Sequence, residues 1–235
     1  MIDAGRYEVI SFDCYGTLVD WESGIISGLR PVLAKHGVDA TDDEILTLHA
    51  ETEHALQSAS TPGDYVKYRE VLGEEVREAG RRWGFEPDPS EVGALADSLR
   101  HWEPFPDTVE ALRRLKSRYK LAIISNVDDG LFALTACHLQ VEIDWIITAE
   151  QAGTYKPSTN NFEVAIARMG IPRERLLHAA QSLFHDVVPA RELGLSTVWV
   201  HRRAGKEGFG ATPPADAESD LEVPDLETLA SRLDV

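Results

Sequence analysis

The amino-acid sequence predicts an α/β fold in which a doubly wound parallel sheet carries an inserted helical cap domain. Short apolar runs of strand length recur along the chain, and amphipathic helical patterns separate the later runs. Residues 21–101 carry helical patterns without a convincing strand. We therefore expect residues 1–19 and 102–235 to form the core domain and residues 20–101 to form the cap domain.

Five short apolar runs are interpreted as buried parallel strands. They are Glu8–Phe12, Leu121–Ser125, Trp145–Thr148, Leu176–Ala180 and Ser196–His201. The helical patterns between the later runs are Thr108–Tyr119, Asn161–Met169 and Val187–Leu193. In a doubly wound sheet the carboxyl ends of the strands meet at one edge, where binding and catalytic sites form.

The cap is expected to be helical throughout. Amphipathic patterns cover Glu22–His36, Asp42–Gln57, Asp64–Trp83 and Ser90–Trp102. The breaks between them, H-G-V-D, S-T-P-G-D and G-F-E-P-D-P, are rich in turn-forming residues. The segment W-E-P-F-P-D marks the return to the core. The turn-rich tail E-G-F-G-A-T-P-P-A-D-A-E-S-D is expected to form a surface loop before a short last helix.

The composition argues against several classes of partner. The 235 residues carry a formal net charge of −17, which disfavours nucleic acid and an anionic membrane surface. The two cysteines, Cys14 and Cys137, show neither metal-ligand spacing nor a disulfide framework. No signal peptide is seen, and no apolar run approaches the roughly 18 residues of a membrane span. We expect a soluble protein of the reducing cytoplasm.

Asp13 is the first candidate catalytic residue. It ends the first predicted strand in the segment F-D-C-Y-G-T-L, where the amides of a tight turn can keep a carboxylate ionised as a nucleophile. Gly16 permits the sharp turn, and Thr17 can bond the loop. Taken alone, Asp13 fits a turn-capping residue equally well.

The ends of the other strands favour the catalytic interpretation. Ser125 and Asn126 end the second strand, Lys156 follows the third in T-Y-K-P, and Asp186 follows the fourth in Q-S-L-F-H-D. Each has an ordinary structural interpretation as a turn, an exposed lysine or a helix N-cap. Because the sheet brings all four strand ends to one edge, their order predicts a catalytic site there.

These segments, in the order F-D-C-Y-G-T-L, I-I-S-N, Y-K-P and Q-S-L-F-H-D-V-V-P-A-R-E-L-G-L, resemble the motifs of the haloacid dehalogenase superfamily. The resemblance covers nearly the whole chain and implies a Rossmann-like core with a helical cap inserted after the first motif. It implies that Asp13 is the nucleophile, that Ser125 and Asn126 bind the substrate or its leaving group, and that Lys156 and Asp186 complete the catalytic set.

Two positions depart from the magnesium-dependent phosphatases of that superfamily. Those enzymes carry aspartate two residues after the nucleophile and again in the fourth motif, where this chain has Tyr15 and Gln181. Magnesium prefers anionic oxygen ligands, so neither a metal nor another cofactor is expected. Aspartate followed by tyrosine two places on resembles the 2-haloacid dehalogenase branch. That branch implies a hydrolase in which Asp13 attacks the carbon next to a carboxylate and water then hydrolyses the ester.

The resemblance to this branch implies further roles. Lys156 keeps Asp13 ionised, and Asp186 positions the hydrolytic water. From the residues alone, Trp21, just after the first motif, either lines the pocket or packs at the hinge. Arg69, near helical spacing from Tyr65 and Tyr68, either binds the substrate carboxylate or faces solvent. The residues expected to bind substrate are Tyr15, Thr17, Ser182, Arg69 and Trp21.

The leaving group is open at this stage. Haloacid dehalogenases carry an arginine early in the cap that receives the halide, but no arginine lies between Arg30 and Arg69. The segments F-D-C-Y-G-T-L-V-D-W-E, Y-K-P-S-T-N-N-F and R-R-A-G-K-E-G-F-G-A-T look closer to a neighbouring group. That group includes azetidine-2-carboxylate hydrolase, which opens a strained C–N bond next to a carboxylate. His185 is a structural neighbour of Asp186 or a proton donor to such an amine.

Two other functions are kept as alternatives. One is a magnesium-dependent phosphatase that tolerates the missing carboxylates, and the other is a catalytically silent binding protein. The expected partner is a small carboxylic acid substrate, with neither nucleic acid nor a membrane. The resemblance suggests a homodimer.

Overall fold

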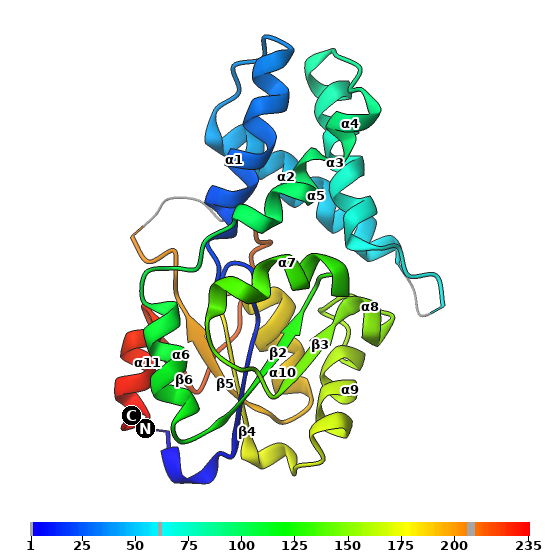
Figure 1. Ribbon diagram of the computed structural model, residues 1–235. Helices are drawn as coiled ribbons and strands as arrows, with labels where there is room; N and C mark the ends of the chain where they lie inside the picture. The colour runs from blue at the N-terminus through cyan, green and yellow to red at the C-terminus, as the bar shows by residue number, and fades with distance from the viewer. Residues whose placement is uncertain (1, 61–62, 206–209) are drawn as a thin grey trace.

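The computed structural model describes residues 2–60, 63–205 and 210–235. A six-stranded parallel sheet with helices on both faces stands below a group of cap helices (Figure 1). The doubly wound α/β fold predicted from the sequence is therefore confirmed.

The central strand of the sheet is the first one in the chain. The strands are β1 (Val9–Phe12), β2 (Lys120–Ser125), β3 (Trp145–Thr148), β4 (Leu176–Ala180), β5 (Ser196–Val200) and β6 (Leu221–Val223). Their spatial order is β3-β2-β1-β4-β5-β6. At the end of β1, Phe12 pairs with Ile123 of β2 on one side and with Ala179 of β4 on the other. The strand order switches direction here, which is where doubly wound sheets bind ligands.

Alternate residues of the strands enter two separate cores. Ile10 and Phe12 pack on one face with α6 (Thr108–Lys116), α7 (Asp129–Leu139) and α11 (Leu226–Arg232). Val9 packs on the opposite face with α9 (Asn160–Met169) and α10 (Val188–Glu192). The short helix α8 (Ala149–Ala152) follows β3 directly. Because both faces are covered, the strands are apolar runs rather than alternating ones.

The cap contains five helices among the described residues. They are α1 (Trp21–Lys35), α2 (Asp42–Ala59), α3 (Tyr68–Trp83), α4 (Pro89–Val92) and α5 (Ala94–Ser98). Side-chain caps begin three of them: Asp20 for α1, Thr41 with Glu44 for α2, and Asp88 with Glu91 for α4. The group lies above the carboxyl edge of the sheet (Figure 1).

The elements differ from the predicted ones in three places. The predicted helix Ser90–Trp102 is divided into α4, α5 and a 3₁₀ turn, Leu99–His101. Helices α7 and α8 were not predicted. Strand β6 follows the predicted tail loop and pairs with β5, so the sheet has one strand more than expected. Residues 206–209 lie outside the described residues. They belong to the segment R-R-A-G-K-E-G-F-G-A-T, residues 202–212, and to the predicted tail loop, which begins at residue 207.

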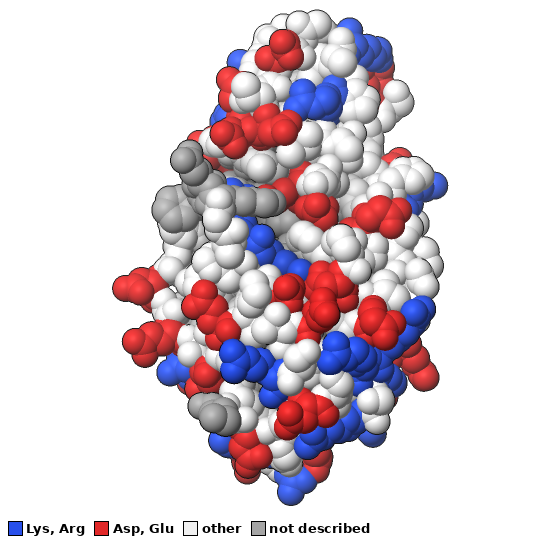
Figure 2. Space-filling view, turned by 90° about the vertical axis from the view of Figure 1, so that its left-hand side faces the viewer, with Lys and Arg blue, Asp and Glu red and all other residues white. Residues whose placement is uncertain are grey.

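Acidic and basic side chains are interspersed over both the cap and the core on the face seen in Figure 2. Within residues 2–60, 63–205 and 210–235, no helix has both the length and the apolar character that crossing a bilayer requires.

Candidate active site

Asp13 lies directly after β1, at the switch point of the sheet. Its side chain is buried, and its Oδ2 accepts a hydrogen bond of 2.8 Å from the hydroxyl of Thr17. The turn that follows depends on Gly16, whose φ of +90° favours glycine. A Cβ at Gly16 would also lie 2.8 Å from Nε1 of Trp21, so the turn packs closely against the first cap helix.

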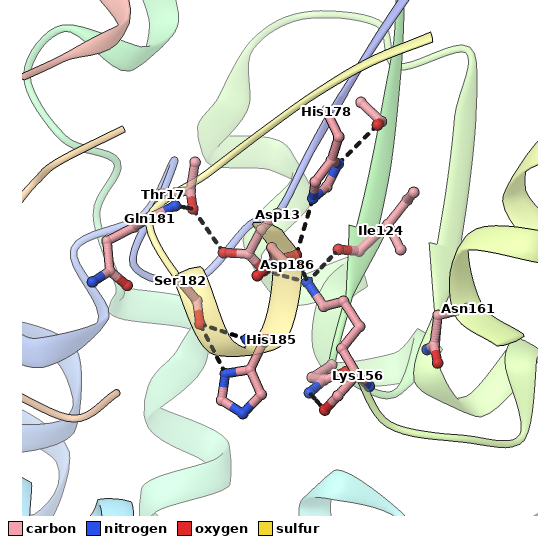
Figure 3. Close-up of polar contacts among 12 residues, drawn as sticks. Asp13, Thr17, Ile124, Lys156, Asn161, His178, Gln181, Ser182, His185 and Asp186 are labelled. Atoms are coloured by element: carbon pink, nitrogen blue, oxygen red, sulfur yellow. Dashed lines mark hydrogen bonds and ion pairs between the residues drawn. The ribbon is translucent and has the colours of Figure 1, made fainter. Parts of the chain in front are cut away.

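Lys156 connects the two carboxylates at the edge of the sheet. Its Nζ donates to Oδ1 of Asp13 at 3.0 Å, to Oδ1 of Asp186 at 2.6 Å and to the carbonyl of Ile124 at 2.8 Å (Figure 3). These contacts use all three ammonium donors. The side chain is 1% exposed, so the charge is stabilised by its two anionic partners rather than by water.

Asp186 is supported by a residue that the sequence analysis did not single out. His178 of β4 is fully buried and places Nε2 3.0 Å from Oδ1 of Asp186. Its Nδ1 lies 2.8 Å from the hydroxyl of Ser11 on β1. A carboxylate only accepts, so Nε2 carries the proton in this contact. The positions of His178 and Ser11 follow from the alternation of side chains along their strands, which the sequence contains. In the sequence, however, His178 resembles an ordinary core histidine.

The two carboxylates have opposite pKa shifts. Burial raises the pKa of Asp13, and the nearby charge of Asp186 adds to it, while Lys156 and Thr17 oppose the rise. Burial also acts on Asp186, but Lys156 and His178 outweigh it and lower the pKa of that carboxyl. Burial lowers the pKa of Lys156, and the two carboxylates reverse the effect and raise it. Asp186 is therefore the more firmly ionised partner of the lysine.

Ser125 and Asn126 lie together at the end of β2 but have different surroundings. The Oγ of Ser125 is buried and has no hydrogen-bond partner among the described residues. Asn126 is occupied: Oδ1 accepts from the backbone N–H of Lys156 at 2.7 Å, and Nδ2 donates to the carbonyl of Lys156 and to Oε1 of Gln57. Asn126 therefore positions the Lys156 loop, while Ser125 presents a hydroxyl to the pocket.

A pocket with about 390 Å³ of space, counting its mouth, lies between this edge and the cap. The core contributes Asp13, Asp186 and Lys156, and the cap contributes aromatic and acidic side chains. The lining residues are Asp13, Tyr15, Trp21, Glu53, Tyr68, Ser125, Asn126, Lys156, Gln181, Ser182, His185, Asp186 and Thr212.

Ser182 and His185 form a short turn beside Asp186. The Oγ of Ser182 accepts from the backbone N–H of His185 at 2.9 Å and lies 3.2 Å from Nδ1 of the same residue (Figure 3). Burial lowers the pKa of His185 to about 4, and the charge of Lys156 adds to the effect. His185 is therefore neutral near pH 7 and is poorly suited to supply a proton to a leaving amine.

Not every predicted substrate-binding residue reaches the pocket. Tyr15, Trp21 and Ser182 line it. Thr17 is fully buried behind Asp13, where it also accepts from the N–H of Gln181, so it orients the Asp13 carboxylate. The structure also corrects the placement of Arg69 toward substrate: its side chain turns outward to Asp97, and only its backbone N–H points to the core, where it donates to Asp128.

The family description haloacid dehalogenase-like hydrolase matches residues 7–194, and the chain belongs to this family. Together with the fold, the match defines the protein as a hydrolase of the haloacid dehalogenase class. The (S)-2-haloacid dehalogenase H-109 of Pseudomonas putida is 29% identical over 222 residues, covering 93% of this chain and 96% of that protein.

Solved structures share the fold at lower identity. L-2-haloacid dehalogenase from Xanthobacter autotrophicus with chloropropionic acid covalently bound has a TM-score of 0.81 and 19% identity, over 97% of this chain and 98% of that one. A putative hydrolase from Bacillus subtilis bound to magnesium has a TM-score of 0.78 and 19% identity, over 98% and 100% of the two chains. The fold alone therefore does not decide whether a metal takes part.

The donor set of this site does not suit a magnesium ion. Lys156 occupies one oxygen of Asp13 and one of Asp186. The hydroxyl of Tyr15 lies 2.9 Å from Oγ1 of Thr135, and Oε1 of Gln181 accepts from Thr212. The described residues contain no group of three or more histidine, cysteine, aspartate or glutamate side chains that could hold a metal. A hard divalent cation requires more anionic oxygen than is offered here.

Proposed function

We propose that the protein is a metal-independent hydrolase of small 2-substituted carboxylic acids that acts through an ester on Asp13. The observation that carries the proposal is the arrangement of Asp13 and Asp186 on the single buried ammonium of Lys156, at the base of a small pocket. Tyr15 and Gln181 stand where the magnesium-dependent members carry aspartate. The resemblance to (S)-2-haloacid dehalogenases supports the same reaction class.

In the first step, a carboxylate oxygen of Asp13 attacks carbon 2 of the substrate. A C–O bond forms, and the bond to the leaving group breaks with its electron pair. Lys156 favours the ionised form of Asp13, and Thr17 fixes the orientation of the carboxylate. The buried, unpartnered hydroxyl of Ser125 supplies a hydrogen bond to the substrate carboxylate.

In the second step, water attacks the carboxyl carbon of the Asp13 ester. The bond between that carbon and the substrate oxygen breaks, which releases a 2-hydroxy acid and regenerates Asp13. Asp186 orients the water, because it lines the pocket and its Oδ2 has no hydrogen-bond partner among the described residues. His178 and Lys156 hold the other oxygen of Asp186 and keep the carboxylate ionised.

The leaving group is a halide or a strained ring nitrogen. Both reactions use the same attack on the carbon next to a carboxylate. The complete set of Asp13, Lys156 and Asp186 argues against a silent binding protein, since a buried lysine between two carboxylates is costly to maintain without chemistry.

The test is turnover in the presence of EDTA. Purified protein is incubated with (S)-2-chloropropionate or (S)-azetidine-2-carboxylate, and halide release and ring-opened product are followed. We expect at least one of the acids to be turned over, and Asp13→Asn to lower the rate by at least about 10³-fold. Asp39→Asn, which changes an exposed aspartate of the cap, is the matched control and should retain activity.

A single turnover in H₂¹⁸O identifies the intermediate. We expect the label to enter the peptide that contains Asp13 before it enters the product, because water attacks the Asp13 carboxyl carbon. Label found only in the product would exclude the ester. Cleavage of p-nitrophenyl phosphate with Mg²⁺, without turnover of either acid in EDTA, would show instead that the protein is a phosphatase.

A further inference from the structure

A buried carboxylate of the cap lines the pocket that holds the nucleophile. Glu53 of α2 is 5% exposed and borders the same space as Asp13, Ser125 and Lys156. In the sequence Glu53 resembles any other glutamate of an amphipathic helix, so it was not predicted as a site residue. The steps proposed above do not use it.

Glu53 is held in a defined orientation by the residues behind it. The hydroxyl of Tyr68 donates to its Oε1 at 2.8 Å. Its Oε2 lies 3.7 Å from Nε2 of His49, whose Nδ1 is 2.8 Å from Glu75. Burial lowers the pKa of His49, but the carboxylates of Glu75 and Glu53 outweigh it and raise that pKa to about 9. Two buried carboxylates therefore share one positive charge.

The charges around the pocket favour a cationic ligand. Among the described lining residues, Lys156 is the one lysine or arginine, and its three donors already contact Asp13, Asp186 and Ile124. The core group Asp13, Asp186 and Lys156 sums to one negative charge. The cap group of Glu53, Glu75 and protonated His49 sums to another. A departing halide beside Glu53 would meet like charge, whereas an ammonium would be stabilised.

We propose that Glu53 binds a positively charged nitrogen on the substrate, so that the enzyme acts on cyclic 2-amino acids whose protonated ring nitrogen is the leaving atom. This rests on the proposed attack by Asp13. Glu53, from α2, contacts the ammonium, and the hydroxyl of Ser125, from β2, contacts the carboxylate. The pocket thus recognises a zwitterion by its two charges.

The ring-opening step balances without a further reagent. The substrate enters with its ring nitrogen protonated. Asp13 forms the C–O bond at carbon 2, the C–N bond breaks, and its electron pair goes to the nitrogen, which leaves as a neutral amine tethered to the ester. The nitrogen already carries its protons, so no separate acid is needed, which agrees with a neutral His185. Burial raises the pKa of Glu53, with His49 and Tyr68 opposing, and the bound cation favours its ionised form.

A pair of unreactive ligands tests the charge recognition. (S)-Proline and (S)-tetrahydrofuran-2-carboxylate have similar shapes, but only proline carries an ammonium. Their dissociation constants for the whole protein are measured by calorimetry. We expect proline to bind more tightly by on the order of ten- to hundred-fold, as a charge-assisted hydrogen bond requires, and Glu53→Gln to remove the difference. Equal affinity of the two ligands, or no binding of either, would overturn the proposal.

Turnover supplies the second test. Glu53→Gln keeps an acceptor for Tyr68 but removes the charge. We expect kcat/KM for (S)-azetidine-2-carboxylate to fall by about 10²-fold relative to kcat/KM for (S)-2-chloropropionate. A merely structural role would lower both by the same factor. Glu51→Gln, on the same helix but exposed and paired with Arg82, is the matched control and should change neither.

The outcomes separate this proposal from the one on which it rests. If chloropropionate is turned over through Asp13 and Glu53→Gln leaves the ratio of the two substrates unchanged, the recognition by Glu53 is wrong while the ester mechanism stands. If neither acid is turned over and the phosphate ester is cleaved only with Mg²⁺, both proposals fail.

Discussion

Asp13 and Asp186 share one lysine, yet their surroundings shift their pKa values in opposite directions. The pKa of Asp13 is raised, mainly by burial, and that of Asp186 is lowered by Lys156 and His178 against its burial. A carboxyl whose pKa is raised on folding destabilises the folded state at every pH above its folded pKa. This destabilisation decreases as the pH falls and is gone below the pKa of the unfolded chain, about 3.9. A carboxyl whose pKa is lowered has the opposite effect.

We therefore predict that substitutions of the two carboxylates differ in their effect on stability. At pH 7, Asp13→Asn should unfold at a higher temperature than the wild type, and the gain should vanish near pH 4. Asp186→Asn should lose about 3 kcal/mol at pH 7, because it breaks a buried pair with Lys156. Thermal unfolding of the three proteins at several pH values measures both effects. An Asp13→Asn protein that is less stable than wild type at pH 7 would show that the Asp13 carboxylate stabilises the fold.

The site residues that could be predicted from the sequence are those whose positions follow from the topology. Asp13, Lys156 and Asp186 end strands or follow them, and a parallel sheet brings such positions to one edge. Glu53 was not found, because the rotation of a cap helix about its axis, and the fit of the cap onto the core, decide which of its glutamates faces the pocket. The outward direction of Arg69 has the same cause.

At the scale of elements, the first cap helix depends on two glycines that are not turn residues. A Cβ built on Gly24 of α1 would lie 2.4 Å from the ring of Trp102, and one on Gly28 would lie 2.4 Å from Oγ of Ser98. Trp102 in turn meets the ring of Tyr15 edge-on, with ring centroids 5.7 Å apart. The close packing of α1 against Trp102 therefore affects the position of Tyr15, a side chain that lines the pocket.

We predict that Gly24→Ala lowers the free energy of unfolding by about 2 kcal/mol, because the added methyl group overpacks against an indole that is 2% exposed. Gly130→Ala, in α7, is the control: a Cβ there meets nothing within 4 Å, so the better helix former should leave stability unchanged or slightly higher. Urea unfolding of both variants measures the difference. Equal stabilities would mean that Trp102 moves aside at little cost.

The elements that were not predicted from the sequence are those whose apolar residues show no clear helical or strand periodicity. Helix α7 buries Leu131, Phe132 and Leu139 and half-buries Leu134, so its apolar residues do not form one stripe. Strand β6 has only three residues and is recognisable only beside β5. Strands β1 to β5 were found because burial on both faces makes them continuous apolar runs.

At the scale of the whole molecule, one carboxylate of the core seats the cap. Asp128, at the start of α7, accepts hydrogen bonds from the backbone N–H groups of Tyr68 and Arg69 at 2.9 and 2.8 Å, and from the hydroxyl of Tyr65 at 2.8 Å. A residue of the core thus serves as the anionic cap of helix α3, which belongs to the other group of helices. Because Tyr68 lines the pocket and holds Glu53, the position of α3 sets the shape of the substrate site.

We predict that Asp128→Ala raises KM by roughly tenfold with a smaller change in kcat, since it loosens the cap walls without touching Asp13 or Lys156. The loss of three hydrogen bonds to one charged group should also lower the free energy of unfolding by about 2–3 kcal/mol. Steady-state kinetics and thermal unfolding measure the two effects. Asp128→Asn, which keeps an acceptor oxygen, should recover part of both, and Asp64→Ala, at an exposed position before α3, should change neither. An Asp128→Ala protein that is less stable but has an unchanged KM would show that the remaining contacts, such as the bond from Tyr155 to the carbonyl of Val66, seat the cap without this carboxylate.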